Sequence, residues 1–429
     1  MLDLSEIENE VLDARTKGYP GAALPRRLGT LGTSGWNLLA GDLPLPVAVL
    51  KREALAHNHA WMRDFCTLTG VGLAPHGKTT MAPQLFAQQL EAGAWGMTFA
   101  TVHQIGIAVR FGVRRIILAN QLLGRAEVAT VCALLAAHPE LELHVLIDSE
   151  AQRAQLEALA AQAGALRPLF ALLEVGYDGG RTGCREPGAA LALARAIAAS
   201  PHLRLSGIEC YEGGFATGDA AADAVRAAPL LAQVRELAIA CASENLFDTD
   251  EVILSAGGSA LFDLVARELP TRLGRPSRTL LRSGCYLTHD SGLYARMLRA
   301  VQTREPTLPR PGLLPALEVW AQVQSCPEPG LAILTLGRRD ASYDQELPIP
   351  QHWYRPGATE APQPLPAGAH ISALNDQHAY LRLPEGCTLA VGDLVGCGIS
   401  HPCTTFDRWQ LLYLVDDEYT VRGGIRTFF

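Results

Sequence analysis

Lysine is almost absent from this chain. Its 36 basic residues include only three lysines, Lys17, Lys51 and Lys78, so nearly all of its positive side chains are guanidinium groups. Arginine stays protonated and forms no imine, whereas a lysine amine can lose its proton and form one. A lysine that is kept therefore suggests amine chemistry. The alternative is a bias towards arginine codons, with Lys78 left by chance.

Lys78 is the best placed of the three lysines. It follows the short apolar run 71–74 and the tripeptide Pro75-His76-Gly77. This pattern predicts a lysine just beyond a buried strand, where α/β barrels place their catalytic groups. Lys17 lies in a polar amino-terminal segment. Lys51 ends the apolar run 46–50 and is the one rival.

Other absences exclude whole classes of protein. The net charge is −8 and no block of like charges occurs, which argues against a nucleic-acid partner. There is no signal-peptide pattern at the start and no apolar run that could span a bilayer, so we expect no membrane partner. The ten cysteines are scattered without a C-x-x-C pair, as in free thiols of a reducing compartment. We expect a cytoplasmic protein that acts on a small molecule.

Apolar runs alternate with Ala/Leu-rich helical stretches from about residue 45 to about residue 290. The predicted strands are 46–50, 71–74, 96–100, 115–119, 143–147, 169–175, 205–211, 251–255 and 279–282. The clearest predicted helices are 126–137, 151–162, 189–199 and 220–242. This alternation is typical of a parallel sheet covered on both faces, and its length favours a (β/α)8 TIM-type barrel over residues 45–300. No G-x-G-x-x-G or Walker-type loop appears in a suitable setting.

The sequence pattern changes after residue 300. A Pro-rich linker at 306–315 precedes strand-like runs at 317–324, 331–336, 378–383, 394–399 and 410–415. Residues 301–429 are thus predicted to form a smaller, mostly antiparallel β domain, with a Pro/Gly-rich surface insertion at 348–369. Residues 1–44 match neither pattern and could pack on the β domain.

Polar and glycine-rich segments follow several predicted barrel strands. They are His76-Gly77-Lys78-Thr79, residues 178–183 with Arg181, residues 209–214 with Tyr211, Gly257-Gly258-Ser259, and residues 283–286 with Tyr286. A Gly-Gly-Ser turn at a helix start exposes backbone N–H groups that can hold a phosphate. Each segment alone is more often an ordinary turn. Together, a lysine, an arginine, a tyrosine and a phosphate cradle are what a pyridoxal phosphate site needs.

The β domain contains His401-Pro402-Cys403. Residues two apart in an extended segment share a face, so both side chains could bind one metal ion. A thiolate with an imidazole favours Zn²⁺, and two protein ligands leave positions for water and substrate, as at a catalytic zinc. The alternative is a buried cysteine beside a hydrogen-bonded histidine.

The order of these motifs over residues 45–415 resembles the D-serine dehydratase / D-threonine aldolase family, which are fold-type III, alanine-racemase-like pyridoxal-phosphate enzymes. The matching pieces are residues 75–79, Glu174-Val175-Gly176, Arg181-Thr182-Gly183, Tyr211, Gly257-Gly258-Ser259, Gly284-Cys285-Tyr286, Asp376-Gln377-His378 and residues 400–403. The resemblance implies a homodimer and a D-amino acid substrate.

The resemblance also implies a role for each matched residue. Lys78 would hold the cofactor and then act as the base at Cα, and Arg181 would face the pyridine nitrogen. The remaining cofactor contacts would come from His76, Tyr211, Gly257, Gly258, Ser259 and Tyr286. His401 and Cys403 would bind the metal ion. Family dehydratases carry His-x-Cys with zinc and the aldolases carry His-x-Asp, so Cys403 favours a dehydratase.

Two positions depart from the family pattern. The family usually has His where this chain has Thr80, and again where it has Glu212. The second acid/base group therefore stays open, with His103, Asp376 and His378 as candidates that could equally be structural.

We expect a dehydratase of D-serine or related D-3-hydroxy amino acids that yields a 2-oxo acid and ammonia. An arginine at the pyridine nitrogen would disfavour ring protonation, so zinc would assist departure of the β-hydroxyl. The nearest alternative is a metal-dependent D-threonine-type aldolase. Further alternatives are an amino-acid racemase, with Tyr343 or Tyr354 as the opposing base, and a non-catalytic cofactor carrier.

Overall fold

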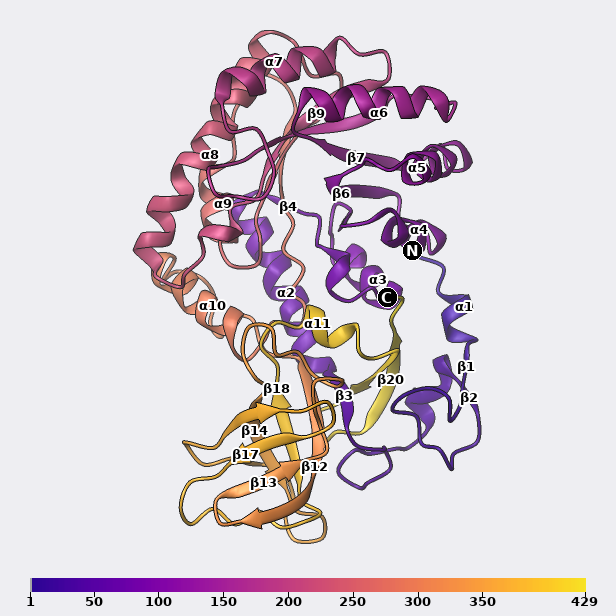
Figure 1. The fold of residues 1–429 in the computed structure, drawn as a ribbon, viewed down its shortest axis with the longest axis vertical. Coiled ribbons are helices and arrows are strands. Elements are labelled where there is room, and N and C mark those ends of the chain that lie inside the picture. Colours follow the sequence, from indigo (N-terminus) through magenta and orange to yellow (C-terminus); the bar gives the residue numbers. More distant parts are fainter. Residues whose placement is uncertain (1) are drawn as a thin grey trace.

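The computed structural model describes residues 2–429, which form a parallel barrel and a second β domain beside it (Figure 1). The barrel sheet has the strand order β4-β11-β10-β9-β8-β7-β6-β5. Its two end strands meet, because His76 forms a parallel bridge with Thr98 and the Thr98 N–H donates to the Pro75 carbonyl over 2.9 Å. The strands are β4 (Gly72–Leu73), β5 (Met97–Phe99), β6 (Arg115–Gln121), β7 (Glu142–Ile147), β8 (Leu169–Val175), β9 (Leu203–Cys210), β10 (Val252–Ala256) and β11 (Ser277–Leu281). The expected α/β barrel is confirmed.

A helix follows each barrel strand. These helices are α3 (Pro83–Glu91), α4 (Val102–Arg110), α5 (Arg125–Ala137), α6 (Glu150–Gln162), α7 (Pro187–Ala198), α8 (Ala220–Ser243), α9 (Phe262–Glu268) and α10 (Leu293–Arg304), and α2 (Arg52–Thr69) precedes β4. Alternate strand residues face opposite sides of the sheet. Thus Ile116 and Leu118 pack in the main core, while Ile117, Leu172 and Ile253 belong to a separate buried cluster. That second cluster fills the barrel interior.

The second domain is built on a sheet of mostly antiparallel strands. They are β3 (Val47–Lys51), β12 (Leu317–Glu328), β13 (Leu331–Leu334), β14 (Ile349–Tyr354), β15 (Gln363–Pro364), β16 (His370–Leu374), β17 (Ala379–Arg382), β18 (Leu394–Gly398), β19 (Leu411–Val415) and β20 (Val421–Arg426). β12 is its longest strand and pairs antiparallel with β13, β18 and β3.

Two strand expectations need correction. Residues 46–50 were predicted as the first barrel strand, but β3 pairs antiparallel with β12 and parallel with β19 in the β domain. A continuous apolar run indicates a strand buried on both faces and does not tell which sheet buries it. The predicted surface insertion 348–369 also contains β14, which pairs along β18.

The amino-terminal segment lies against both domains. Its elements are α1 (Ser5–Glu8), β1 (Val11–Leu12), β2 (Arg26–Arg27) and the 3-10 helix η1 (Leu28–Thr33). Ile7, Leu12 and Tyr19 share a buried cluster with Trp320 and Tyr413 of the β domain. The backbone N–H of Asp3 also donates to the Phe111 carbonyl beyond α4.

The β domain reaches the barrel mouth through the turn after β18 and the short helix α11 (Cys403–Phe406), which Figure 1 shows between the two domains. The Ser291 N–H donates to the Ile399 carbonyl over 2.8 Å, and the His401 N–H donates to Asp290 Oδ2 over 2.9 Å. These bonds place residues 399–403 beside the loop that follows β11.

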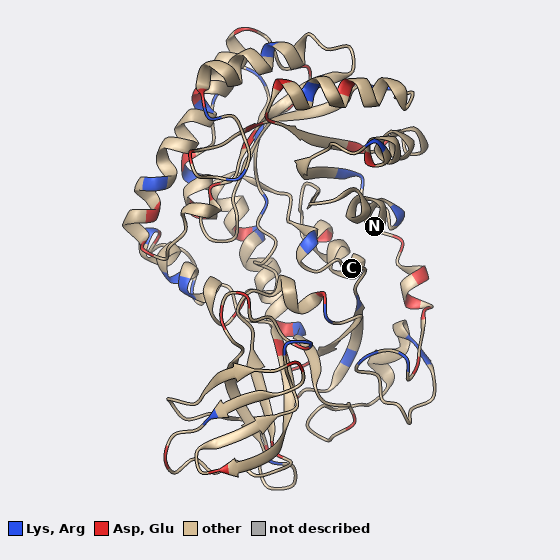
Figure 2. Cartoon of the chain, viewed as in Figure 1, with Lys and Arg blue, Asp and Glu red and all other residues tan. Residues whose placement is uncertain are grey.

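Basic and acidic residues are interspersed over both domains (Figure 2). Within residues 2–429, no helix combines the length and apolar character needed to cross a membrane.

Candidate active site

A cavity of about 320 Å³ lies at the carboxyl ends of the barrel strands, within the lower part of the size range of small-molecule sites. The residues that line it include Lys78, Arg181, Tyr211, Arg282, His401 and Cys403. The first four follow or end barrel strands, whereas the last two come from the β domain. The structure thus brings together groups that the sequence places hundreds of residues apart.

Lys78 lies in the 3-10 helix η2 (Gly77–Thr79) directly after β4, with its side chain exposed at the cavity. Gly77 allows the close packing beneath it, because a Cβ there would lie 2.4 Å from the Phe99 ring. The other lysines are elsewhere. Lys17 Nζ pairs with Asp340 Oδ1 at 2.9 Å, and Lys51 belongs to β3 of the other sheet. Lys78 is therefore the lysine amine of this cavity.

Arg282, which the sequence analysis counted only as the end of a strand, forms part of the cavity lining at the end of β11. Its side chain is buried, and Nη2 lies 2.7 Å from Glu209 Oε2. Its guanidinium also donates to Ser255 Oγ over 2.8 Å and to the Cys210 carbonyl over 2.9 Å. A charged residue at the end of a predicted barrel strand was the signal that could have identified it.

Arg181 also lines the cavity but is more exposed, and its guanidinium carbon lies 4.5 Å from the centroid of the Tyr211 ring. Its predicted contact with a pyridine nitrogen stays a prediction. The buried Arg282 is a second guanidinium with access to the same space.

Three buried carboxyl groups surround Arg282. Burial raises the pKa of Glu174, Glu212 and Glu209, and that of Glu209 reaches about 8. Glu174 accepts a hydrogen bond from Thr182 Oγ1 over 2.5 Å and another from the Gln121 amide. With one arginine among three acids, removal from water outweighs the attraction to the guanidinium.

Glu212 already occupies part of the predicted phosphate cradle. Its carboxylate accepts the Gly257 N–H at 3.0 Å and the Gly258 N–H at 2.9 Å. Ser259 Oγ in turn accepts the Cys285 N–H at 3.2 Å. A phosphate that used both glycine N–H groups would have to displace Glu212, so the cradle stays a prediction.

Tyr286 and His76 differ in how they meet the cavity. The Tyr286 hydroxyl accepts a hydrogen bond from the Gln89 amide, and its ring lies edge-on to His59, so its side chain points away from the cavity. Only its backbone remains available for the expected phosphate contact. His76 lines the cavity. Burial, reinforced by Lys78, holds the pKa of His76 well below its usual range, so the ring is neutral at pH 7.

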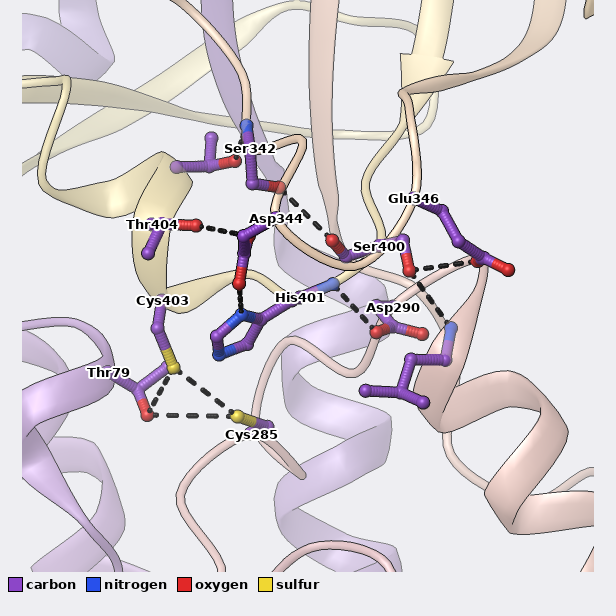
Figure 3. Close-up of polar contacts among 12 residues, drawn as sticks. Thr79, Cys285, Asp290, Ser342, Asp344, Glu346, Ser400, His401, Cys403 and Thr404 are labelled. Atoms are coloured by element: carbon purple, nitrogen blue, oxygen red, sulfur yellow. Dashed lines mark hydrogen bonds and ion pairs between the residues drawn. The ribbon is translucent and has the colours of Figure 1, made fainter. Parts of the chain in front are cut away.

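His401 and Cys403 lie close to a second thiol (Figure 3). The Cys403 sulfur lies 3.6 Å from the Cys285 sulfur and 3.3 Å from Thr79 Oγ1. His401 Nδ1 pairs with Asp344 Oδ2 at 2.5 Å, which leaves Nε2 for another partner. A thiol and an imidazole are donors that suit Zn²⁺. Across residues 2–429, however, no three His, Cys, Asp or Glu side chains already lie close enough to form a metal site.

The other candidate acid/base residues are not part of this cavity. The cavity lining described for residues 2–429 contains none of His103, Asp376, His378, Tyr343 and Tyr354. It does contain Tyr294 of α10, which the sequence analysis missed.

Family models match both domains. The alanine racemase N-terminal domain model matches residues 50–288, more than half of the chain. The putative serine dehydratase domain model matches residues 316–415, which include the His401/Cys403 segment.

Related proteins span most of the chain. The chain is 26% identical over 397 residues to a D-threonine aldolase from Arthrobacter sp., covering 89% of this chain and 93% of that protein. It is 28% identical over 250 residues to a D-threo-3-hydroxyaspartate dehydratase from Delftia sp. (strain HT23), covering 53% and 63% respectively. The crystal structure of D-threonine aldolase from Filomicrobium marinum superposes with a TM-score of 0.74 at 23% identity, covering 92% of this chain and 97% of that one.

The parallel barrel with a lysine after its first strand, the appended β domain and the two family matches lead to one assignment. The chain belongs to the alanine-racemase-like, fold-type III family of pyridoxal-phosphate enzymes and, within it, to the D-serine dehydratase / D-threonine aldolase group of lyases.

Proposed function

We propose that this protein is a pyridoxal-phosphate- and zinc-dependent dehydratase of D-3-hydroxy amino acids, such as D-serine, which yields a 2-oxo acid and ammonia. One observation carries the proposal. Lys78 of the barrel and the His401/Cys403 pair of the β domain line the same cavity. An amine and a soft metal-binding pair beside one substrate would serve the two ends of an elimination reaction.

The residues of the cavity fit the cofactor. Lys78 offers an amine for its aldehyde, and Arg181 and Arg282 offer positive charge near the ring. A Cβ on Gly284 would lie 2.4 Å from the His76 carbonyl, so only glycine lets these loops approach so closely. Bound here, the cofactor would supply an electron sink that makes the Cα–H bond of the amino acid acidic.

We propose that Lys78 would hold the cofactor aldehyde and would also be the base that removes the Cα proton of the bound amino acid. Burial raises the pKa of the Glu209 carboxyl, and Nη2 of Arg282 lies 2.7 Å from it. These two buried side chains form the polar floor of the cavity. His76, whose pKa burial holds well below its usual range, adds no positive charge to this part of the cavity at neutral pH.

His401 and Cys403 fit zinc by the chemistry of their donor atoms. Zinc held there would supply a Lewis acid for the departing β-hydroxyl. Loss of the Cα proton and of hydroxide leaves an enamine, which takes up water and gives the 2-oxo acid and ammonia.

An aldolase is the second candidate, because the aldolase from Arthrobacter sp. is similar over 89% of this chain. One feature favours the dehydratase. The metal-binding pair contains the thiol of Cys403, the residue type that the family dehydratases carry.

Product analysis separates these reactions. The purified protein with pyridoxal phosphate and zinc is incubated with D-threonine, with L-threonine as the control. We expect 2-oxobutyrate and ammonia. Glycine with acetaldehyde would instead establish the aldolase, and D-to-L interconversion without either product would establish a racemase.

We also propose a cytoplasmic homodimer. The family supports the dimer, and the ten cysteines, each unpaired in the structure of residues 2–429, support a reducing compartment. Light scattering on the purified protein tests the dimer: a monomer mass would overturn it.

A further inference from the structure

Cys285 and Cys403 are separated by the distance expected of two sulfur atoms on one zinc ion. Zinc–sulfur bonds are about 2.3 Å long, so two thiolates on a tetrahedral zinc lie about 3.8 Å apart. The observed separation is 3.6 Å. A disulfide would require the atoms to approach to about 2.05 Å.

The position of Cys285 is set by its surroundings. It follows β11 and is 5% exposed, with its N–H bonded to Ser259 Oγ at 3.2 Å. Thr79 Oγ1 lies 3.8 Å from the Cys285 sulfur and 3.3 Å from the Cys403 sulfur, so one hydroxyl contacts both thiols. Barrel and β domain therefore each contribute one thiol to the same spot.

His401 is oriented towards this pair. Its backbone has a positive φ of 76°, and its N–H donates to Asp290 Oδ2 over 2.9 Å. The bond of Nδ1 to Asp344 fixes the ring, and Figure 3 shows the free ring nitrogen on the side that faces the two sulfur atoms. The three groups do not yet lie within one coordination sphere, so an ion would draw the ring towards the sulfurs.

We propose that Cys285 is a third protein ligand of the zinc ion, alongside His401 and Cys403, an inference that rests on the metal-dependent function proposed above. Two thiolates and a neutral imidazole make a Cys₂His donor set, which leaves a fourth position for water or the substrate hydroxyl. Two thiolates balance the charge of Zn²⁺ and select soft ions over Mg²⁺ or Mn²⁺. The site is then complete only when both domains are in place.

X-ray absorption at the zinc edge of the holoenzyme, prepared under reducing conditions, tests this ligand set. We expect two sulfur atoms at about 2.3 Å in the wild type and one in Cys285→Ala. Cys285→Ser, which keeps the side-chain shape, serves if the alanine variant folds poorly. The control is Cys397→Ala, a buried cysteine of β18, which should keep two sulfurs.

Zinc retention against a chelator gives a second readout. Cys285→Ala should bind zinc at least about tenfold more weakly, since even the loss of an outer partner of a ligand costs that much. One sulfur in both the wild type and Cys285→Ala, or a Cys285–Cys403 disulfide in the zinc-loaded protein, would overturn the inference. If the zinc of the wild type has two sulfur ligands but the protein forms no 2-oxo acid, the dehydratase function is refuted and the proposed ligand set still holds.

Discussion

Nη2 of Arg282 lies 2.7 Å from Oε2 of Glu209 inside the barrel, where the two side chains are 8% and 1% exposed. The carboxyl nevertheless has a raised pKa of about 8, because burial penalises its charged form and Glu174 and Glu212 lie nearby. At neutral pH the Glu209 carboxyl in the folded protein therefore holds a proton that it would release in the unfolded chain.

Glu209→Gln should remove a pH dependence of stability. Between about pH 4.5 and about pH 8 the folded protein keeps the Glu209 proton while the unfolded chain loses it, so the wild type becomes less stable as pH rises. The unfolding free energy of the variant, relative to wild type, should rise by up to about 1.4 kcal/mol per pH unit in this window. Urea denaturation at several pH values measures it.

Glu150→Gln is the matched control. Hydrogen bonds from Arg153 lower the pKa of Glu150. Glu150 therefore changes the pH dependence of stability only below about pH 4.5, outside the window of Glu209. A stability difference for Glu209→Gln that stays flat across the window would show that Glu209 is ionised in the folded protein.

The two arginines of the cavity should differ in their effect on stability. Arg282→Met leaves three buried carboxyl groups without their cation and should cost about 3–5 kcal/mol. Arg181→Met loses only the contact with the Tyr211 ring, worth about 0.5–1 kcal/mol. Equal losses in chemical denaturation would contradict this division.

Lys78→Ala should abolish both activity and the visible absorption band of the covalently held cofactor. The control is Lys51→Ala, whose amine lies 5.9 Å from the Tyr419 ring in the β domain. Absorption spectra after dialysis, together with the mass of the borohydride-reduced protein, check the attachment site. A band that survives in Lys78→Ala and disappears in Lys51→Ala would reassign it.

Glu212→Ala should destabilise the apo protein by about 1–3 kcal/mol, because the N–H groups of Gly257 and Gly258 lose their acceptor. We also expect tighter cofactor binding, because the carboxyl that a phosphate would have to displace from these two N–H groups is gone. Urea denaturation and fluorescence titration with pyridoxal phosphate measure the two effects. Glu385→Ala, at an exposed position, should change neither.

Asp344→Asn should weaken zinc binding by about 10- to 100-fold, because the carboxylate orients the His401 ring and raises its basicity. Equilibrium dialysis with zinc measures the change. The control is Asp407→Asn, which alters a nearby carboxylate paired with Arg408. This variant should bind zinc with wild-type affinity. Equal affinity in the Asp344 variant would show that the imidazole needs no such partner.

The barrel could be predicted because its strands are short apolar runs that alternate regularly with helices, a pattern fixed by local sequence. The placement of Lys78, Arg181 and Tyr211 followed from the rule that barrel loops after the strands share one face. The sheet to which β3 belongs could not be predicted, since its partners β12 and β19 lie more than 250 residues away.

The direction of individual side chains was the second feature that could not be predicted from the sequence. Tyr286 directly follows Cys285, yet the two side chains point to different sides of the loop, which sequence order does not reveal. Glu212 was noted only as a departure from the family pattern. Its hydrogen bonds to Gly257 and Gly258 join the ends of two neighbouring strands, a pairing visible only in three dimensions.

The pairing of β3 with β12 and β19 has a consequence for biosynthesis. Because β3 precedes the barrel in the sequence and its partners β12 and β19 follow it, the β domain cannot close before the barrel residues between them have been synthesised. The barrel strands and Lys78 therefore leave the ribosome before the turn that carries His401 and Cys403. A fragment that begins after the barrel would lack an inner strand, so the two halves of the enzyme should not be separable by truncation.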